Sequence, residues 1–239
     1  MIKNNYFLVV IIPEKYMNRM TLLVIMLAWF SGCGQASQEY FPLGENIRWE
    51  YVIEEQVNDE KKILKSIVTG LKSRTIEGLT YYPLIYASGE IYYFRKSTDG
   101  IIVTPKPGQP GNIILGFPLE VGTDWKTETQ LGILHHRHES FSGGESFISL
   151  GQDIILDFHI AGLDETVDVP AGKFFNCMRI DGIGTVKVEA RTRGLDHILI
   201  EQTDWYARGT GLVKRIRTEA SIPEKYRGTH TQELVAIKR

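Results

Sequence analysis

The residues best suited to chemistry lie in one short stretch, 134–139, which reads LHHRHE. In a β-strand His136 and His138 would point to the same side, and His159 from another strand could complete a set of three imidazole ligands. Zinc takes such ligands in catalytic sites that leave a fourth position open to water. Arg137, however, would bring a positive charge close to that metal. We therefore favour the alternative, solvated histidines on an exposed strand or hairpin, and expect no bound metal and no cofactor.

Other catalytic signatures are missing from the sequence. The glycine-flanked serine at 142–144 lacks the G-x-S-x-G elbow of hydrolases. Paired carboxylates such as Asp164-Glu165 sit where turns or strand ends are expected, so solvation is the simpler interpretation. The sequence predicts a protein that is not an enzyme, and a metal-dependent hydrolase built on the three histidines is the alternative.

The amino terminus carries a targeting signal. An apolar run at Thr21–Phe30 is too short to span a bilayer, follows Arg19 and precedes Ser31-Gly32-Cys33, which is typical of a secretory signal peptide. Its end, FSGC, resembles the lipobox of bacterial lipoproteins, although Phe30 stands where Leu or Val is usual. That resemblance implies that Cys33 receives lipid and becomes the first residue of the mature chain.

These signals divide the chain into three parts. We expect a signal peptide over 1–32, in which 1–16 could be a mis-assigned start before Met17 or Met20, then a lipid-anchored tether over 33–45 and an antiparallel β domain over 46–239. Cleavage before Cys33 leaves 207 of the 239 residues and changes the formal net charge from -2 to -4. A chain so poor in excess positive charge is not expected to bind nucleic acid.

Alternating apolar residues indicate that the mature chain is built from strands. The inward residues of two such segments are Ile47, Trp49, Tyr51 and Ile53, and Ile154, Leu156, Phe158 and Ile160. Further strands are expected at 79–87, 91–97, 124–140, 173–190, 195–207, 211–219 and 229–238, and a hairpin is expected to turn at Asn58-Asp59. The pattern predicts an all-β fold, an antiparallel meander that forms a curled sheet or barrel after a cleaved signal peptide.

Three strings carry a family resemblance. FPL-x5-W occurs twice, ending at Trp49 and Trp125, and is followed by VDVPAGKFFNCMRI and DWYARGTGLVKRI. We expect each tryptophan to pack inward. In this order the strings resemble those of uncharacterised bacterial envelope lipoproteins, over 40–219 most clearly. The resemblance implies a lipid-anchored β domain and brings no catalytic residues.

Two clusters and one thiol could serve binding. The aromatic residues Tyr81, Tyr82, Tyr86, Tyr92, Tyr93 and Phe94 span two expected strands and could line a cavity, although cross-strand packing is the simpler interpretation. The basic run 214–217 could touch anionic headgroups, but is more simply the wet face of an edge or outer strand. Cys177 lies in an apolar run and is expected to be an inert, buried residue.

Together these features predict a membrane-anchored lipoprotein of the bacterial cell envelope, held through lipid on Cys33. Its non-catalytic β domain would bind a protein partner or an apolar ligand, and a purely structural envelope component is a further alternative. Gly34 rather than aspartate follows the cysteine. In a double-membraned bacterium the likeness to other lipoproteins would then imply the outer membrane, facing the periplasm.

Overall fold

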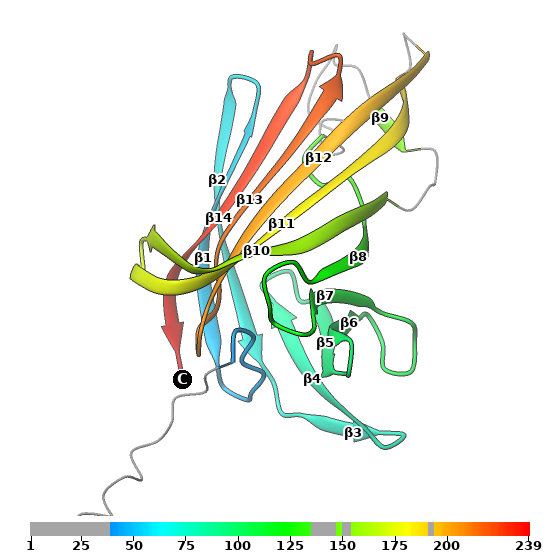
Figure 1. Ribbon diagram of the computed structural model, residues 1–239. Helices are drawn as coiled ribbons and strands as arrows, with labels where there is room; N and C mark the ends of the chain where they lie inside the picture. The colour runs from blue at the N-terminus through cyan, green and yellow to red at the C-terminus, as the bar shows by residue number, and fades with distance from the viewer. Residues whose placement is uncertain (1–38, 135–146, 150–153, 191–193) are drawn as a thin grey trace, which may run out of the picture. The chain divides into compact units, whose positions relative to one another are not determined.

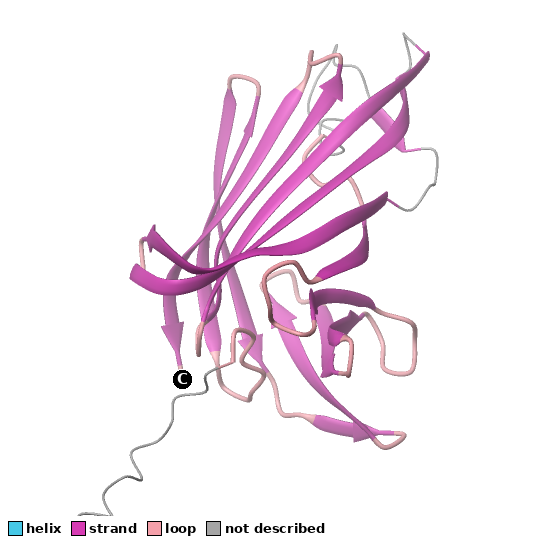
Figure 2. Ribbon diagram, in the orientation of Figure 1, coloured by secondary structure: helices cyan, strands magenta, loops and turns pink. Residues whose placement is uncertain are grey.

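The described part of the chain folds from β-strands alone. The computed structural model describes residues 39–134, 147–149, 154–190 and 194–239, which belong to one compact unit, Ser37–Arg239 (Figures 1 and 2). The expected signal peptide and Cys33 lie outside the described residues. Within the described ranges, no helix is long and apolar enough to cross a membrane.

The strands pair with one another in a single antiparallel sheet. They are β1 Arg48–Val57, β2 Glu60–Gly70, β3 Arg74–Ile76, β4 Leu79–Tyr86, β5 Ile91–Lys96, β6 Gly100–Thr104, β7 Asn112–Gly116, β8 Asp124–Thr129, β9 Phe147–Ser149, β10 Ile154–Val169, β11 Gly172–Ala190, β12 Gly194–Ala207, β13 Gly211–Ile222 and β14 Arg227–Lys238. Their order is β7-β6-β5-β4-β2-β1-β14-β13-β12-β11-β10-β8, with β3 added beside β4 and β9 beside β11.

The sheet curls until its two outer strands meet. β7 and β8 share no backbone ladder, but the side chain of Asn112 donates from Nδ2 to the carbonyl of Glu128 at 3.2 Å, and the Thr127 hydroxyl donates to the carbonyl of Ile113. The unit is therefore a nearly closed barrel, in which the shorter strands β4–β7 lie across from the long strands (Figure 1). The all-β, antiparallel fold predicted from the sequence is confirmed.

Local sequence explains the best-defined strands. In β10, Ile154, Leu156, Phe158 and Ile160 are buried and the residues between them are exposed, as the alternation predicts. β1 and β2 form the hairpin expected at Asn58-Asp59, where Asn58 takes a φ of 50°. Asparagine tolerates this left-handed conformation better than most residues, which favours a turn over the continuous helix that the surrounding composition would allow.

One expected strand boundary was wrong, and two strands were not expected. The strand expected at 124–140 ends at Thr129, and the chain then leaves the sheet over 130–134; residues 135–140 lie outside the described ranges. The sequence did not predict β6 and β7, which flank a proline- and glycine-rich connection. Both strands are only five residues long, too short for alternation to be recognised.

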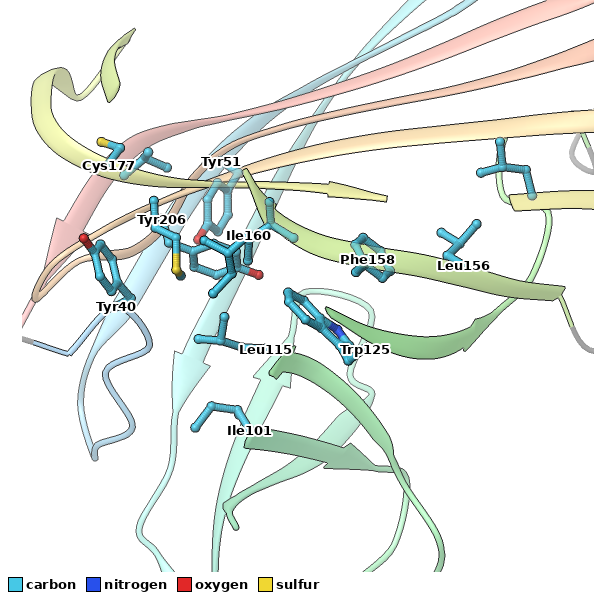
Figure 3. Packing of buried hydrophobic residues seen from close by; sticks show 14 of the residues in the cluster. Tyr40, Tyr51, Ile101, Leu115, Trp125, Leu156, Phe158, Ile160, Cys177 and Tyr206 are labelled. Carbon is cyan, nitrogen blue, oxygen red and sulfur yellow. The ribbon is translucent and has the colours of Figure 1, made fainter. Parts of the chain in front are cut away.

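The tryptophans of the repeated FPL-x5-W string both pack inward, as predicted, with Trp49 and Trp125 buried. Trp125 stacks on Phe158 with ring centroids 5.6 Å apart (Figure 3). At the other copy, Tyr40 is 1% exposed and its hydroxyl donates to the carbonyl of Asn176 at 3.2 Å. Packing of the β unit thus reaches into the segment expected to be a tether, 33–45.

Candidate functional site

The inner face of the curled sheet borders a half-open cavity of about 600 Å³. That volume lies within the range of roughly 300–1,000 Å³ that small-molecule sites occupy in proteins. Its wall is mostly apolar and aromatic and is formed by Phe41, Pro42, Trp49, Tyr51, Val68, Leu84, Tyr86, Glu90, Tyr92, Phe94, Val103, Ile114, Thr129, Tyr206, Gly211, Leu212, Arg215 and Gln232. Because Glu90 is exposed, the rim of the cavity lies at the β4–β5 turn.

Aromatic rings dominate this wall. Phe41, brought in by the first FPL string, stacks on Phe94 at 5.4 Å and lies 6.2 Å from Tyr206. Tyr86 and Tyr92 meet edge to face at 5.5 Å across β4 and β5. Both interpretations of the aromatic cluster therefore hold, because its members pack across strands and three of them, Tyr86, Tyr92 and Phe94, also line the cavity.

The polar atoms of two wall aromatics are bonded to the backbone. The Trp49 indole donates from Nε1 to the carbonyl of Thr210 at 2.6 Å, and the Tyr51 hydroxyl donates to the carbonyl of Leu212 at 3.1 Å. Figure 3 shows Tyr51 and Tyr206 together in the core. Burial raises the pKa of both phenols well above the ordinary value, so they stay neutral over the physiological range.

One ion pair stands in this apolar wall. Arg215 on β13 faces Asp204 on β12 and donates from Nε to Oδ1 at 2.7 Å and from Nη2 to Oδ2 at 2.6 Å. Gln202 adds a bond from Nε2 to Asp204 Oδ2 at 3.1 Å. Burial works against the Arg215 charge, but the facing carboxylate outweighs it and holds the pKa of Arg215 above its usual range. The guanidinium is therefore permanently charged and paired.

A second ion pair fastens the chain that follows β8. Glu219 is fully buried and accepts the backbone N–H groups of Gly132, Ile133 and Leu134 at 2.9 to 3.0 Å. Arg217 donates to Glu219 Oε1 at 3.0 Å and, from Nη2, to the carbonyl of Gln130 at 2.7 Å. We call residues 130–134 the strap, since these contacts hold them to the inner face of the sheet.

The interpretation of run 214–217 as a wet edge was wrong. β13 lies between β12 and β14 in the sheet, and Arg215 and Arg217 point inward to Asp204 and Glu219. Lys214 lies on the opposite face of the sheet, where its Nζ is 2.7 Å from Glu233 Oε1. The two inward arginines are consequently not placed to contact headgroups.

Of the three candidate metal ligands, the structure describes His159. His159 is exposed on the outer face of β10, where it lines a shallow concavity with Trp205 and Ile183 and does not reach the cavity. His136 and His138 lie outside the described residues. Among the residues that the structure describes, no group of three or more His, Cys, Asp or Glu side chains could hold a metal ion.

Cys177 is buried, and burial, with the charge of Glu165 as a smaller cause, raises the pKa of its thiol to about 11. A thiol so rarely ionised is a poor nucleophile, as the sequence analysis expected.

The Asp204–Arg215 pair was not predicted from the sequence, although a signal for one partner was present. Ile198 and Ile200 are buried, and continuing their alternation along β12 places Gln202, Asp204 and Tyr206 on the same inner face. The residue of β13 that faces Asp204 could not be found in the same way, because the pairing of β12 with β13 shifts register between Trp205 and Tyr206.

Comparison with known proteins finds two similar solved structures. No family model matches this chain, and no curated protein matches it. A candidate exported protein with a YmcC-like fold from Bacteroides fragilis has 13% sequence identity and a TM-score of 0.41, covering 83% of this chain and 98% of that chain. A candidate lipoprotein from Parabacteroides distasonis has 14% identity and a TM-score of 0.38, covering 84% and 99%.

Proposed function

We propose that this protein is a lipid-anchored component of the bacterial cell envelope whose β unit binds an apolar small molecule and does not transform it. The observation that carries the binding role is the aromatic-lined cavity of about 600 Å³ on the inner face of the sheet. A small barrel either fills its interior with side chains or keeps room for a ligand. In this barrel the side chains leave the cavity of about 600 Å³ unfilled.

The chemistry of the wall favours an apolar occupant. The indole N–H of Trp49 and the hydroxyl of Tyr51 donate to backbone carbonyls, so the two rings present carbon surface to the cavity. Leu84, Val103 and Ile114 extend this surface. Apolar ligand area removed from water against such a wall contributes roughly 25 cal/mol per Å².

The anchor is supported by the sequence, and the packing of Tyr40 limits the distance between Cys33 and the β unit. The FSGC string predicts lipid on Cys33, and Tyr40 is already buried in the β unit. A six-residue connection, 34–39, spans at most about 20 Å. In this proposal the cavity is therefore held close to the membrane surface, in reach of molecules that leave a lipid layer.

The anchor is tested by fractionating cells that express the wild-type chain or its Cys33→Ser variant. The wild type should sediment with membranes and incorporate labelled fatty acid, and the variant should do neither. Equal incorporation by both chains would refute the anchor on Cys33.

The binding role is tested with the full Cys33→Ser chain and N-phenylnaphthylamine, a probe that fluoresces in apolar surroundings. Val103→Trp on the cavity wall should abolish the fluorescence gain, because the larger ring fills the space. Val235→Trp is the matched control, since Val235 is 41% exposed on β14. If the probe binds neither wild type nor control, or binds all three chains equally, the cavity is not a ligand site.

A further inference from the structure

We infer that the ligand of the cavity is an uncharged amphiphile, an acyl chain that carries an ester or amide carbonyl, with its carbonyl oxygen bound at Arg215. This inference rests on the binding role proposed above and names the class of molecule bound. It follows from which polar atoms of the wall remain available, from the charge balance beside them, and from the apolar surface that surrounds them.

Arg215 offers donors to the cavity. A guanidinium has five N–H groups and no acceptor. Its Nε and Nη2 donate to Asp204, and the Tyr206 hydroxyl is a third hydrogen-bond partner of the same guanidinium. Among the described residues, these bonds leave two of the five N–H groups to donate at the cavity wall. A ligand atom that meets this group must therefore be an acceptor, as a carbonyl oxygen is.

Gln232 stands beside this donor. Arg215 pairs with Gln232 across β13 and β14, and both side chains line the cavity. The amide of Gln232 can donate a second hydrogen bond to the same oxygen, or accept one from an amide N–H of the ligand. Arg215 and Gln232 thus place two neighbouring polar groups on one strand pair of a mostly apolar wall.

The local charge favours a neutral ligand over an acid. Asp204 already compensates Arg215, and both carboxylate oxygens accept hydrogen bonds from Arg215. The other charged residue of the described cavity wall is Glu90, at the rim. A fatty acid would add one negative charge to a paired site with an acidic rim, and burying a carboxylate without its own counter-ion is unfavourable. A carbonyl oxygen accepts the same bonds without that cost.

The rest of the wall suits an alkyl chain. Trp49, Tyr51 and the Phe41–Phe94 stack present carbon surface, and the hydroxyl and indole N–H of the first two are engaged elsewhere. The chain of the ligand therefore packs on rings while its carbonyl reaches the strand pair β13–β14.

The experiment displaces N-phenylnaphthylamine from the full Cys33→Ser chain with three ligands of similar length: methyl palmitate, palmitate and hexadecane. Methyl palmitate should bind about tenfold more tightly than hexadecane, as expected for one hydrogen bond to a charged group. Palmitate should bind more weakly than methyl palmitate. Equal affinity for the ester and the hydrocarbon, or tighter binding of palmitate, would overturn the inference while leaving the binding role intact; failure of all three to displace a bound probe would refute the binding role as well.

Two variants locate the carbonyl. Asp204→Asn/Arg215→Gln removes both charges and should lower the affinity for methyl palmitate to that for hexadecane, with hexadecane itself unaffected. Lys214→Gln/Glu233→Gln removes an equivalent ion pair from the opposite face of the sheet and should leave all three affinities unchanged. If the first variant does not fold, Gln232→Leu keeps the ion pair and should weaken methyl palmitate alone, several-fold. An ester preference that stays as large as in the wild type in a folded variant of either kind contradicts the placement at Arg215.

Discussion

Glu219 binds the backbone of Leu134 across 85 residues of sequence, with its Oε2 accepting the Leu134 N–H at 3.0 Å. The same carboxylate takes the N–H groups of Ile133 and Gly132 and the guanidinium of Arg217. A fully buried carboxylate is stable in such a place only because every bond it needs is present. The strap is therefore the partner that allows Glu219 to be there.

Replacing Glu219 by Gln should lower the free energy of unfolding by about 2–4 kcal/mol, because the amide NH2 faces backbone donors and Arg217 loses its counter-charge. Urea denaturation measures the loss, and hydrogen exchange should quicken at the amides of 132–134. Glu233→Gln is the control, since its partly exposed pair with Lys214 is worth about 1 kcal/mol. Similar losses in both variants would show that the strap contributes nothing special.

Asp204→Ala should destabilise the fold by about 3 kcal/mol, because it leaves Arg215 charged in an apolar wall. Adding Arg215→Met should restore much of the lost stability, since the unpaired charge is then gone. Thermal or urea unfolding of both single variants and of the double variant completes the cycle. Additive losses in the double variant would mean that the two side chains do not depend on each other.

Cys177 should resist alkylation in the folded protein. With a pKa of about 11 the thiol is ionised to roughly one part in a thousand at pH 8. Iodoacetamide should label the Cys33→Ser chain slowly in buffer and rapidly in denaturant. The contribution of this thiol to stability is complete below its ordinary pKa of 9.0 and is lost as the pH rises towards 11, because the unfolded chain releases the proton first. Rapid labelling of the native chain would contradict this burial.

Gly182→Ala should be destabilising by about 1–3 kcal/mol. A Cβ there would lie 2.3 Å from the ring of Phe158, which is itself held by stacking on Trp125. Gly162→Ala provides the matched control on the neighbouring strand, since its Cβ would meet no atom closer than 3.8 Å. Unfolding curves of the two alanine variants should separate clearly; coincident curves would show that Phe158 moves aside freely.

The parts of the fold that sequence predicts well are those whose cause is local. β10 alternates because one face of it is buried, and the Asn58-Asp59 turn forms because Asn58 accepts a left-handed backbone. The end of β8 at Thr129 has a distant cause instead, since the strap leaves the sheet to reach Glu219 and Arg217. No pattern within 124–140 indicates that this segment binds a residue about 85 positions further along the chain.

The ion pairs of the candidate site could not be predicted from the sequence either, because they too depend on distant residues. Arg215 and Arg217 have the composition of a solvent-facing strand, and their inward direction depends on the counter-charges Asp204 and Glu219. The aromatic residues of the wall could be named from sequence, whereas the space between them depends on how far the sheet curls. That curvature is a property of the whole set of paired strands.

β7 and β8 meet along a seam that has no backbone ladder. Every other neighbouring pair in the order is joined by a row of backbone bonds, whereas this line is held by the side chains of Asn112 and Thr127. Opening this seam therefore breaks no backbone ladder, but it breaks two side-chain hydrogen bonds, each worth about 1 kcal/mol, and separates the Trp125 ring from Gly116. Ile114 on β7 and Thr129 on β8 also line the cavity. Under the proposed binding role, ligands of different width would be accommodated by opening this one seam while the rest of the sheet keeps its register.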